Sequence, residues 1–214
     1  PMTHIPVMLE EAIDVLIHRS EGVYVDCTFG RGGHAAAILK RLSVNGRLIV
    51  MDKDPEAINC ALMRFKSEPR VTVVHGSFAS IKAHLLDADI RQVDGIFLDL
   101  GVSSDQLDTA ERGFSFMRSG PLDMRMDNSQ GQSAAEWLRI ADESEIARVL
   151  KDYGEERYAK RIARALVATR DVEPLETTQA LANLIERVSP SRDHHKHPAT
   201  RAFQAIRIQV NREL

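Results

Sequence analysis

The sequence predicts an α/β fold in which the strands of a parallel β-sheet alternate with helices, followed by an all-helical block. Four short apolar runs lie in the first half of the chain, at Val23–Val25, Leu48–Met51, Val71–Val74 and Ile96–Leu98. Stretches of helical length separate these runs, and strands connected in this way form right-handed βαβ units in a parallel sheet. From Ser133 onward the pattern is helical throughout.

The first half contains four expected helices. Residues Val7–His18 place apolar side chains at helical spacing. The others are expected at His34–Leu42, Pro55–Phe65 and Phe78–Leu86, and proline is favoured at a helix start such as position 55. In sheets of this kind, ligands bind beyond the carboxyl ends of the strands.

The second half begins with residues 105–132, which carry several glycines and a proline without periodicity and are expected to form a long ordered loop. Ser133 and Glu136 form a capping box, and Asp142 with Glu145 repeats that signal. Further helices are expected at Glu155–Thr169, Thr178–Val188 and Ala199–Leu214. Four strands are fewer than a doubly wound domain usually has, so the chain is expected to be truncated at its C-terminus, with more strands beyond Leu214.

Composition favours a soluble protein of the cytoplasm. No apolar run approaches the roughly 20 residues that cross a bilayer, and the N-terminus lacks the pattern of a signal peptide. The two cysteines, Cys27 and Cys60, lie in expected core segments, which is typical of a reduced compartment. The net charge of −3 requires that a nucleic-acid partner be bound by a local basic surface.

The most informative segment runs from Tyr24 to His34, where an apolar strand ends in a glycine-rich turn that opens a helix. Glycine lets the backbone approach a ligand closely, and the helix start presents free amides to it. Gly30, Gly32 and Ala35 satisfy a loose dinucleotide fingerprint, with Asp52 about 20 residues further on. An NAD-type oxidoreductase is therefore one hypothesis, although Asp52 would hold ribose hydroxyls in either class of cofactor.

Two other acids favour a cationic cofactor. Asp26 lies inside the first strand, where its carboxylate would repel a pyrophosphate but would pair with the ammonium of S-adenosylmethionine. Asp99 ends the fourth strand and adds a second carboxylate, which suits a sulfonium cofactor. Phe78 would lie against an adenine. Alternatives remain open: Asp26 as a cap of the turn, Phe78 as core, and His34 as a helix start without a ligand.

Long motifs resemble the bacterial 16S ribosomal RNA (cytosine-N4)-methyltransferase family. They include Asp26-x-Thr28-Phe29-Gly30-Arg31-Gly32-Gly33-His34, Leu98-Asp99-Leu100-Gly101-Val102-Ser103-Ser104, Gly120-Pro121-Leu122-Asp123-Met124-Arg125-Met126-Asp127, Tyr153-Gly154-Glu155-Glu156 and His197-Pro198-Ala199-Thr200-Arg201. Shorter matches are His4-x-Pro6-Val7-Met8-Leu9, Asp52-Lys53-Asp54-Pro55, Gln106-Leu107-Asp108 and Glu111-Arg112-Gly113-Phe114-Ser115-Phe116. The resemblance extends from His4 to Leu214. It implies a class I methyltransferase-like (Rossmann-like) sheet with an inserted helical domain.

The resemblance also implies an activity, the transfer of a methyl group from S-adenosylmethionine to N4 of a cytosine in the decoding region of 16S rRNA. The implied cofactor contacts are Gly32, Gly33, His34, Asp52, Phe78, Asp99 and Gln106. Asp26 is a candidate for the methionine end of the cofactor. Residues 1–104 would form the cofactor-binding core, 105–200 the loop and RNA-binding insertion, and 201–214 a helix leading back toward the core. The implied partner is rRNA in the small subunit, and a homodimer is the oligomer considered.

Asp99 is the candidate acceptor of the N4 proton, with Ser103 and Ser104 as alternatives that would otherwise cap a helix. The aromatic platform found at this place in DNA amino-methyltransferases is absent. A non-catalytic ribosome-assembly factor that retains the cofactor pocket is a third hypothesis.

RNA binding is expected in the second half. The candidate residues are Arg112, Arg118, Arg125, Lys160, Arg161, Lys196, His197 and Arg201. Lys160 and Arg161 belong to a basic helical repeat with Arg157 and Arg164, for which a solvated face is the usual explanation. The histidines at 194, 195 and 197 lack accompanying carboxylate or cysteine ligands, so no metal site is expected. Trp137 is expected in the core of the insertion.

Overall fold

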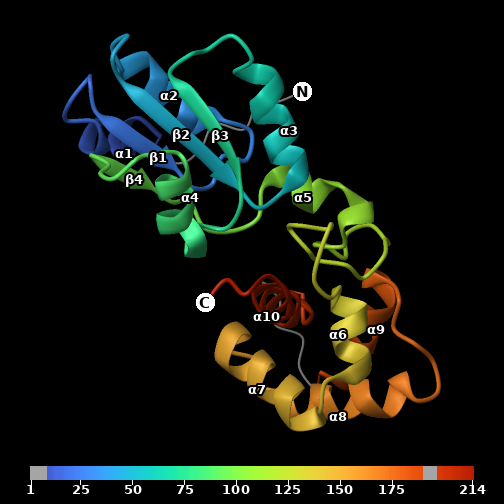
Figure 1. Ribbon diagram of the computed structural model, residues 1–214. Coiled ribbons are helices and arrows are strands. Elements are labelled where there is room, and N and C mark those ends of the chain that lie inside the picture. Colours follow the sequence, from blue (N-terminus) through green and yellow to red (C-terminus); the bar gives the residue numbers. More distant parts are fainter. Residues whose placement is uncertain (1–8, 190–196) are drawn as a thin grey trace. The chain divides into compact units, whose positions relative to one another are not determined.

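The computed structural model describes residues 9–189 and 197–214, and these form two compact units with the boundary between Gly101 and Val102. The first unit alternates helices and strands in the predicted order (Figure 1). Its elements are α1 (Leu9–Leu16), β1 (Val23–Asp26), α2 (Gly33–Arg41), β2 (Arg47–Asp52), α3 (Pro55–Arg64), β3 (Val71–His75), the 3-10 turn η1 (Phe78–Ser80), α4 (Ile81–Asp87) and β4 (Gly95–Phe97). The predicted α/β fold class is therefore confirmed.

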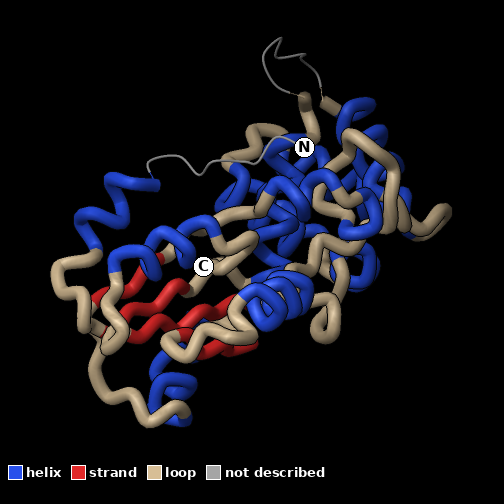
Figure 2. The backbone as a smooth tube through the Cα atoms, turned by 90° about the horizontal axis from the view of Figure 1, so that it is seen from above, coloured by secondary structure: helices blue, strands red, loops and turns tan. Residues whose placement is uncertain are grey.

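The four strands pair in parallel in the order β3-β2-β1-β4 (Figure 2). The chain builds outward from β1 to β3 and then crosses to the other side of β1 to form β4. Asp26 at the end of β1 pairs in register with Val50 and Phe97, and Asp52 at the end of β2 pairs with His75. The carboxyl ends of all four strands therefore meet at one edge of the sheet.

Both faces of the central strands are buried, which explains their continuous apolar runs. Side chains alternate between two clusters, because successive residues of a strand point to opposite faces. Leu48 and Val50 belong to the cluster formed with α1, α2 and α3, whereas Ile49 and Met51 belong to the cluster formed with Phe78 and α4. The helices therefore hold the sheet from both sides.

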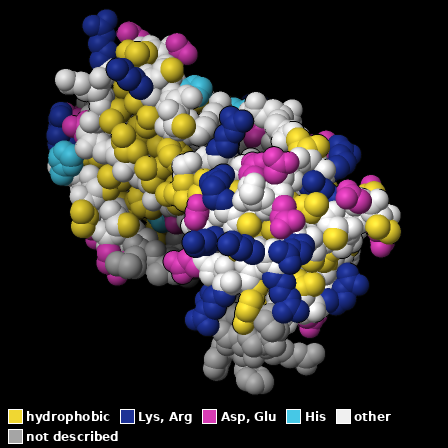
Figure 3. Space-filling model, turned by 90° about the horizontal axis from the view of Figure 1, so that it is seen from below, with side chains coloured by type: hydrophobic (Ala, Val, Ile, Leu, Met, Phe, Trp, Pro, Cys, Tyr) yellow, Lys and Arg dark blue, Asp and Glu magenta, His cyan; other side chains and the backbone are white. Residues whose placement is uncertain are grey.

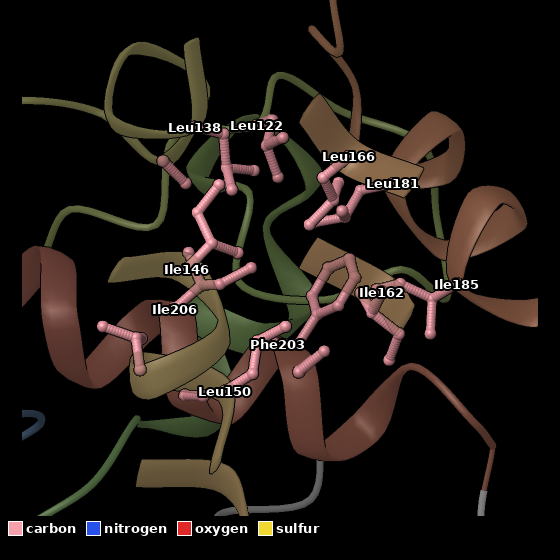
Figure 4. Close-up of a cluster of buried hydrophobic side chains, with 14 of the residues drawn as sticks. Leu122, Leu138, Ile146, Leu150, Ile162, Leu166, Leu181, Ile185, Phe203 and Ile206 are labelled. Carbon is pink, nitrogen blue, oxygen red and sulfur yellow. The ribbon is translucent and has the colours of Figure 1, made fainter. Parts of the chain in front are cut away.

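The second unit is helical. Its elements are α5 (Ser104–Asp108), the 3-10 turn η2 (Ala110–Arg112), α6 (Ala134–Ile140), α7 (Glu143–Gly154), α8 (Ala159–Arg170), α9 (Thr178–Val188) and α10 (Thr200–Asn211). One buried cluster contains side chains from each of the helices α6, α7, α8, α9 and α10. Ile146, Leu166, Ile185 and Phe203 are among its members (Figure 4). Trp137 is 6% exposed within this cluster, as predicted.

The segment between η2 and α6 has no regular helix or strand and is held by side chains of the loop, of η2 and of α10, where Asn211 accepts a hydrogen bond from the amide of Met126 over 2.7 Å. The buried guanidinium of Arg112 donates to the carbonyl of Met126 over 2.8 Å and lies over the Phe114 ring. Arg125 pairs with Asp123 at 2.8 Å. The prediction of an ordered loop is correct from Gly113 onward, but it was wrong for the first residues, which form α5 and η2.

One predicted helix cap and one predicted helix start differ from the structure. Asp142 precedes α7, but its side chain makes no capping hydrogen bond. The helix predicted from Glu155 begins only at Ala159, because Glu155 adopts a left-handed conformation with φ of 50° and ends α7. In the described ranges, no helix is long and apolar enough to cross a membrane.

Candidate functional site

The candidate site lies at the carboxyl edge of the sheet, where the strand order reverses between β1 and β4. Such a reversal opens a crevice in which open α/β sheets bind their ligands. Asp26 ends β1 and Asp52 ends β2, while Asp99 follows β4 by two residues. Asp26 pairs in register with Val50 and Phe97, two residues before Asp52 and Asp99, so the three carboxylates lie at the same edge of the sheet.

The glycine-rich turn after β1 depends on backbone conformations that favour glycine. Gly30 and Gly32 have φ of 52° and 77°, in the left-handed region. A Cβ on Gly32 would lie 2.6 Å from the Phe29 ring and 2.8 Å from the Arg64 guanidinium. Gly32 also precedes α2 without providing a side-chain cap, so the first amides of α2 remain available to a ligand at this edge.

Asp52 connects the turn to the end of β2. One carboxylate oxygen accepts a hydrogen bond from the amide of Gly30 over 2.9 Å, and the other accepts from the amide of Asp54 over 2.9 Å. Burial raises the pKa of Asp52, and these amide hydrogen bonds oppose the shift. Since each carboxylate oxygen can accept a second hydrogen bond, Asp52 retains capacity for ribose hydroxyls.

Asp26 is the most unusual group in the site. It is fully buried, and its Oδ1 accepts from the amide of Thr28 over 3.1 Å, so it does cap the turn. Its Oδ2 is buried with no hydrogen-bond partner among the described residues. Burial raises the pKa of Asp26 to about 7; the Thr28 amide lowers it, and the charges of Asp52 and Asp99 raise it. A buried acceptor without a partner is costly unless a donor or cation completes it.

His34 and Asp99 lie on the β4 side of the turn. His34 is 8% exposed, and its ring packs against that of Phe97, with centroids 4.2 Å apart. Burial lowers the pKa of His34, and the charge of Asp99 acts in the opposite direction. The Asp99 side chain is exposed, and its amide donates to Thr28 Oγ1 over 2.7 Å. Sequence reasoning did not assign roles to Thr28 and Phe97, whose contacts cross the fold.

Phe78 and Cys27 lie on the face covered by α4. Phe78 is half-buried and packs against the cluster that contains Val25 and Met51, so part of its ring contributes to the core. Burial raises the pKa of the Cys27 thiol to about 12, which makes it unreactive. No group of His, Cys, Asp and Glu side chains in the described ranges could hold a metal ion.

Three of the residues predicted to act in catalysis or cofactor binding belong to the second unit. The Ser103 hydroxyl accepts from the amide of Gln106 over 3.2 Å, and Gln106 Oε1 accepts from the amide of Ser103 over 3.0 Å. Ser103 and Gln106 therefore form the capping box of α5, and Ser104 is its first residue. The helix-cap interpretation of Ser103 is correct.

The predicted RNA-binding residues have different environments. Arg112 and Arg125 hold the loop together, whereas Arg118, Lys160 and Arg161 are exposed. The His197 ring lies 4.5 Å from that of Phe116, and its Nδ1 accepts from the amide of Ala199. Arg201 donates to the carbonyl of Glu155 over 3.1 Å. Lys196 and the histidines at 194 and 195 lie outside the described residues.

Comparison with known proteins gives consistent matches. The model of the MraW methylase family matches residues 1–214. The protein called ribosomal RNA small subunit methyltransferase H, from Idiomarina loihiensis, is 54% identical over 212 residues, which cover 99% of this chain and 67% of that protein. A solved structure described as a candidate rRNA methylase, from Clostridium thermocellum, is 22% identical, with a TM-score of 0.36, over 48% of this chain and 58% of its own. The chain belongs to the MraW methylase family, and a methyl donor is therefore part of its chemistry.

Proposed function

We propose that this protein transfers a methyl group from S-adenosylmethionine to the N4 amino group of a cytosine in the decoding region of 16S rRNA. Membership of the methylase family and the high identity to a protein named as a small-subunit rRNA methyltransferase support this function. The observation that carries the choice of cofactor is the buried Oδ2 of Asp26, without a partner among the described residues, in a region that also holds Asp52 and Asp99.

The residues of the sheet edge fit S-adenosylmethionine better than a dinucleotide. Three carboxylates would repel a pyrophosphate, whereas they attract a ligand with sulfonium and ammonium charges. Asp26 would bind the ammonium and Asp52 the ribose hydroxyls. The backbone from Gly32 to His34 would line the ligand, and Phe78 would contact the adenine. Gln106 is proposed as a further contact, and S-adenosylmethionine supplies an electrophilic methyl group when bound.

Asp99 is our candidate for the group that takes the N4 proton. The lone pair of N4 is delocalised into the cytosine ring, which makes the amine a weak nucleophile. A carboxylate that accepts a hydrogen bond from N4–H localises that pair and then receives the proton. Asp99 suits this role because its side chain is exposed at the sheet edge while its amide is fixed to Thr28. Ser103 is engaged in the α5 cap, so Ser104 is the alternative acceptor.

The proposal extends to organisation and partners. Residues 1–104 would bind the cofactor, residues 105–200 would bind RNA, and residues 201–214 would lead back toward the core. The target base must leave its stack to react, and a single-stranded site in the small ribosomal subunit suits this need. The reaction would take place in the cytoplasm, and a homodimer is the oligomer to test.

The decisive experiment measures transfer of labelled methyl from S-adenosylmethionine to unmethylated small ribosomal subunits, with mapping of the modified nucleoside. We expect N4-methylcytidine at a single decoding-region site. Asp99→Asn should lower kcat at least about 100-fold, with S-adenosylhomocysteine binding measured separately. Unchanged methylation by Asp99→Asn would refute its role as proton acceptor. Binding of NAD in place of S-adenosylhomocysteine, or cofactor binding without transfer by the wild type, would refute the proposed reaction.

A further inference from the structure

A cavity of about 670 Å³ lies where α7 ends and α8 begins, within the helical unit. Four cationic side chains line it: Lys151 from the last turn of α7, Arg157 from the connection, and Lys160 and Arg161 from the first turn of α8. Two carboxylates, Glu155 and Glu156, also line it, so the four cations exceed the acids by two. The lining is therefore net positive in a protein whose overall charge is −3.

The cations of this cavity are available to a ligand. All four side chains are exposed, and none of them forms an ion pair with another described residue. Basic residues elsewhere on the same helices do face acids: Arg148 lies 4.0 Å from Asp152, and Arg164 lies 3.9 Å from Glu143. Figure 3 shows Lys and Arg interspersed with Asp and Glu over the helical unit. Within the part of the chain that the structure describes, these four cations have no ion-pair partner, and they line a concave surface; both features distinguish the site from the general surface.

The backbone and the acidic side chains are compatible with an anion here. The first turn of α8 lines the cavity, and a helix start favours negative charge. Tyr158 occupies the N-cap position of α8, and its side chain makes no capping hydrogen bond to the first turn. Glu156 is buried, and its carboxylate accepts a hydrogen bond from the amide of Tyr158 over 2.9 Å, which fixes the carboxylate against the turn before α8. Glu155 is exposed and can accept a hydrogen bond from a ribose hydroxyl.

We propose that this cavity binds backbone phosphates of the substrate RNA and so holds the RNA on the helical unit. The inference rests on the proposed function, because it takes the rRNA of that reaction as its ligand. Arginine matches phosphate with paired hydrogen bonds, and lysine adds a point charge. The volume exceeds that of a single phosphate group, and the acceptor at Glu155 favours RNA over DNA.

The test compares two double variants of the full chain that remove the same charge. Lys160→Ala/Arg161→Ala removes two cavity cations, whereas Arg139→Ala/Arg148→Ala removes two exposed cations of α6 and α7 outside the cavity. Binding of unmethylated small subunits is measured without a methyl donor at several salt concentrations. Methyl transfer is then measured for KM and kcat. Thermal melting checks that each variant is folded, and Lys151→Ala repeats the test from the α7 side.

We expect the cavity variant to bind subunits about tenfold more weakly and to raise KM by the same factor, with kcat within about twofold of the wild type. The dependence of binding on salt should weaken by about 0.7 in the log–log slope per lost phosphate contact. The control variant should change each quantity less than about twofold. Equal losses in both variants would overturn the proposal, as would binding of inorganic phosphate with unaltered subunit affinity. A wild type that binds subunits through this cavity but transfers no methyl would refute the proposed function alone.

Discussion

The carboxylate of Asp52, at the end of β2, accepts a hydrogen bond over 2.9 Å from the amide of Gly30, in the turn that follows β1. A second bond from the amide of Asp54 fixes the other oxygen of the same carboxylate. The group that would hold the cofactor ribose therefore also fixes the loop that would approach the rest of the cofactor. Cofactor affinity and local order of the turn should change together when this side chain is altered.

Replacing Asp52 with Ala should weaken S-adenosylhomocysteine binding at least about tenfold, since charged hydrogen bonds are each worth about 1.5–3 kcal/mol. Asp52→Asn keeps one oxygen acceptor but loses the charge. Its affinity for S-adenosylhomocysteine should therefore lie between that of the Ala variant and that of the wild type. Isothermal titration calorimetry measures the affinity, and amide hydrogen exchange of Gly30 reports on the turn. Wild-type affinity in the Ala variant would exclude Asp52 from the cofactor site.

Asp26 should make the stability of the protein depend on pH. Its pKa is about 7 in the folded chain, against 3.8 for an ordinary Asp, so between these values the folded chain keeps a proton that the unfolded chain has lost. Raising the pH through this window lowers the free energy of unfolding, by about 4 kcal/mol in total. Asp26→Asn removes this titration. Urea unfolding should therefore show the variant gaining stability relative to the wild type from pH 4 to pH 8.

Asp94 provides a control, because its contribution to the free energy of unfolding should change with pH in the opposite direction. Its carboxylate accepts a hydrogen bond from the amide of Val23 over 2.8 Å, and this bond holds the pKa of Asp94 below its ordinary value. The carboxylate form therefore stabilises the fold, and this stabilisation is lost as the pH falls through the folded pKa. Asp94→Asn should become less stable relative to the wild type as the pH rises. If the stability of both Asn variants relative to the wild type changed with pH in the same direction, the raised pKa of Asp26 would be contradicted.

The sequence was sufficient to locate elements whose signals are local. The apolar runs predicted all four strands because parallel strands are buried on both faces. The helix Thr178–Val188 was predicted with its observed bounds, and in the structure the Thr177 side chain caps it by accepting a hydrogen bond from the amide of Ala180. The break at Glu155 was missed because a non-glycine residue there adopts a left-handed conformation, for which glycine is the usual signal.

The candidate site shows the same division between local and distant signals. Asp26, Asp52 and Asp99 were predicted to meet because each lies at the end of a predicted parallel strand. The hydrogen bond from Asp99 to Thr28, the packing of His34 on Phe97, and the internal role of Arg112 depend on contacts between distant segments. Such contacts leave no periodic pattern, so sequence reasoning could not separate structural arginines from exposed ones.

Gly32 and Gly30 should respond differently to alanine, although both have positive φ. At Gly30 a Cβ would meet nothing within 4 Å, so the cost is the left-handed strain of about 1–2 kcal/mol. At Gly32 the Cβ would also meet the Phe29 ring at 2.6 Å, which adds an overpacking cost of about 1–3 kcal/mol. Urea unfolding of Gly32→Ala and Gly30→Ala measures the difference. Equal losses would show that Phe29 moves aside without cost.

Gly154, the last residue of α7, gives the sharpest test of packing in the helical unit. Within a helix, replacing glycine with alanine ordinarily stabilises by about 0.5–1 kcal/mol. Here a Cβ would lie 2.4 Å from the carbonyl oxygen of Arg201 and 2.9 Å from the Cβ of Ala205, both on α10. The backbone of α10 cannot move aside without disturbing the buried cluster. Gly154→Ala should therefore destabilise the protein by about 1–3 kcal/mol.

Ser144→Ala serves as the matched control, because Ser144 is exposed near the start of the same helix. It should leave the free energy of unfolding within about 0.5 kcal/mol of the wild type. Thermal and urea unfolding, followed by circular dichroism, measure both variants. If Gly154→Ala is as stable as the wild type or more stable, α7 and α10 do not approach as closely as the structure indicates. A loss confined to Gly154→Ala would assign the glycine of the Tyr153–Glu156 motif to this close helix contact.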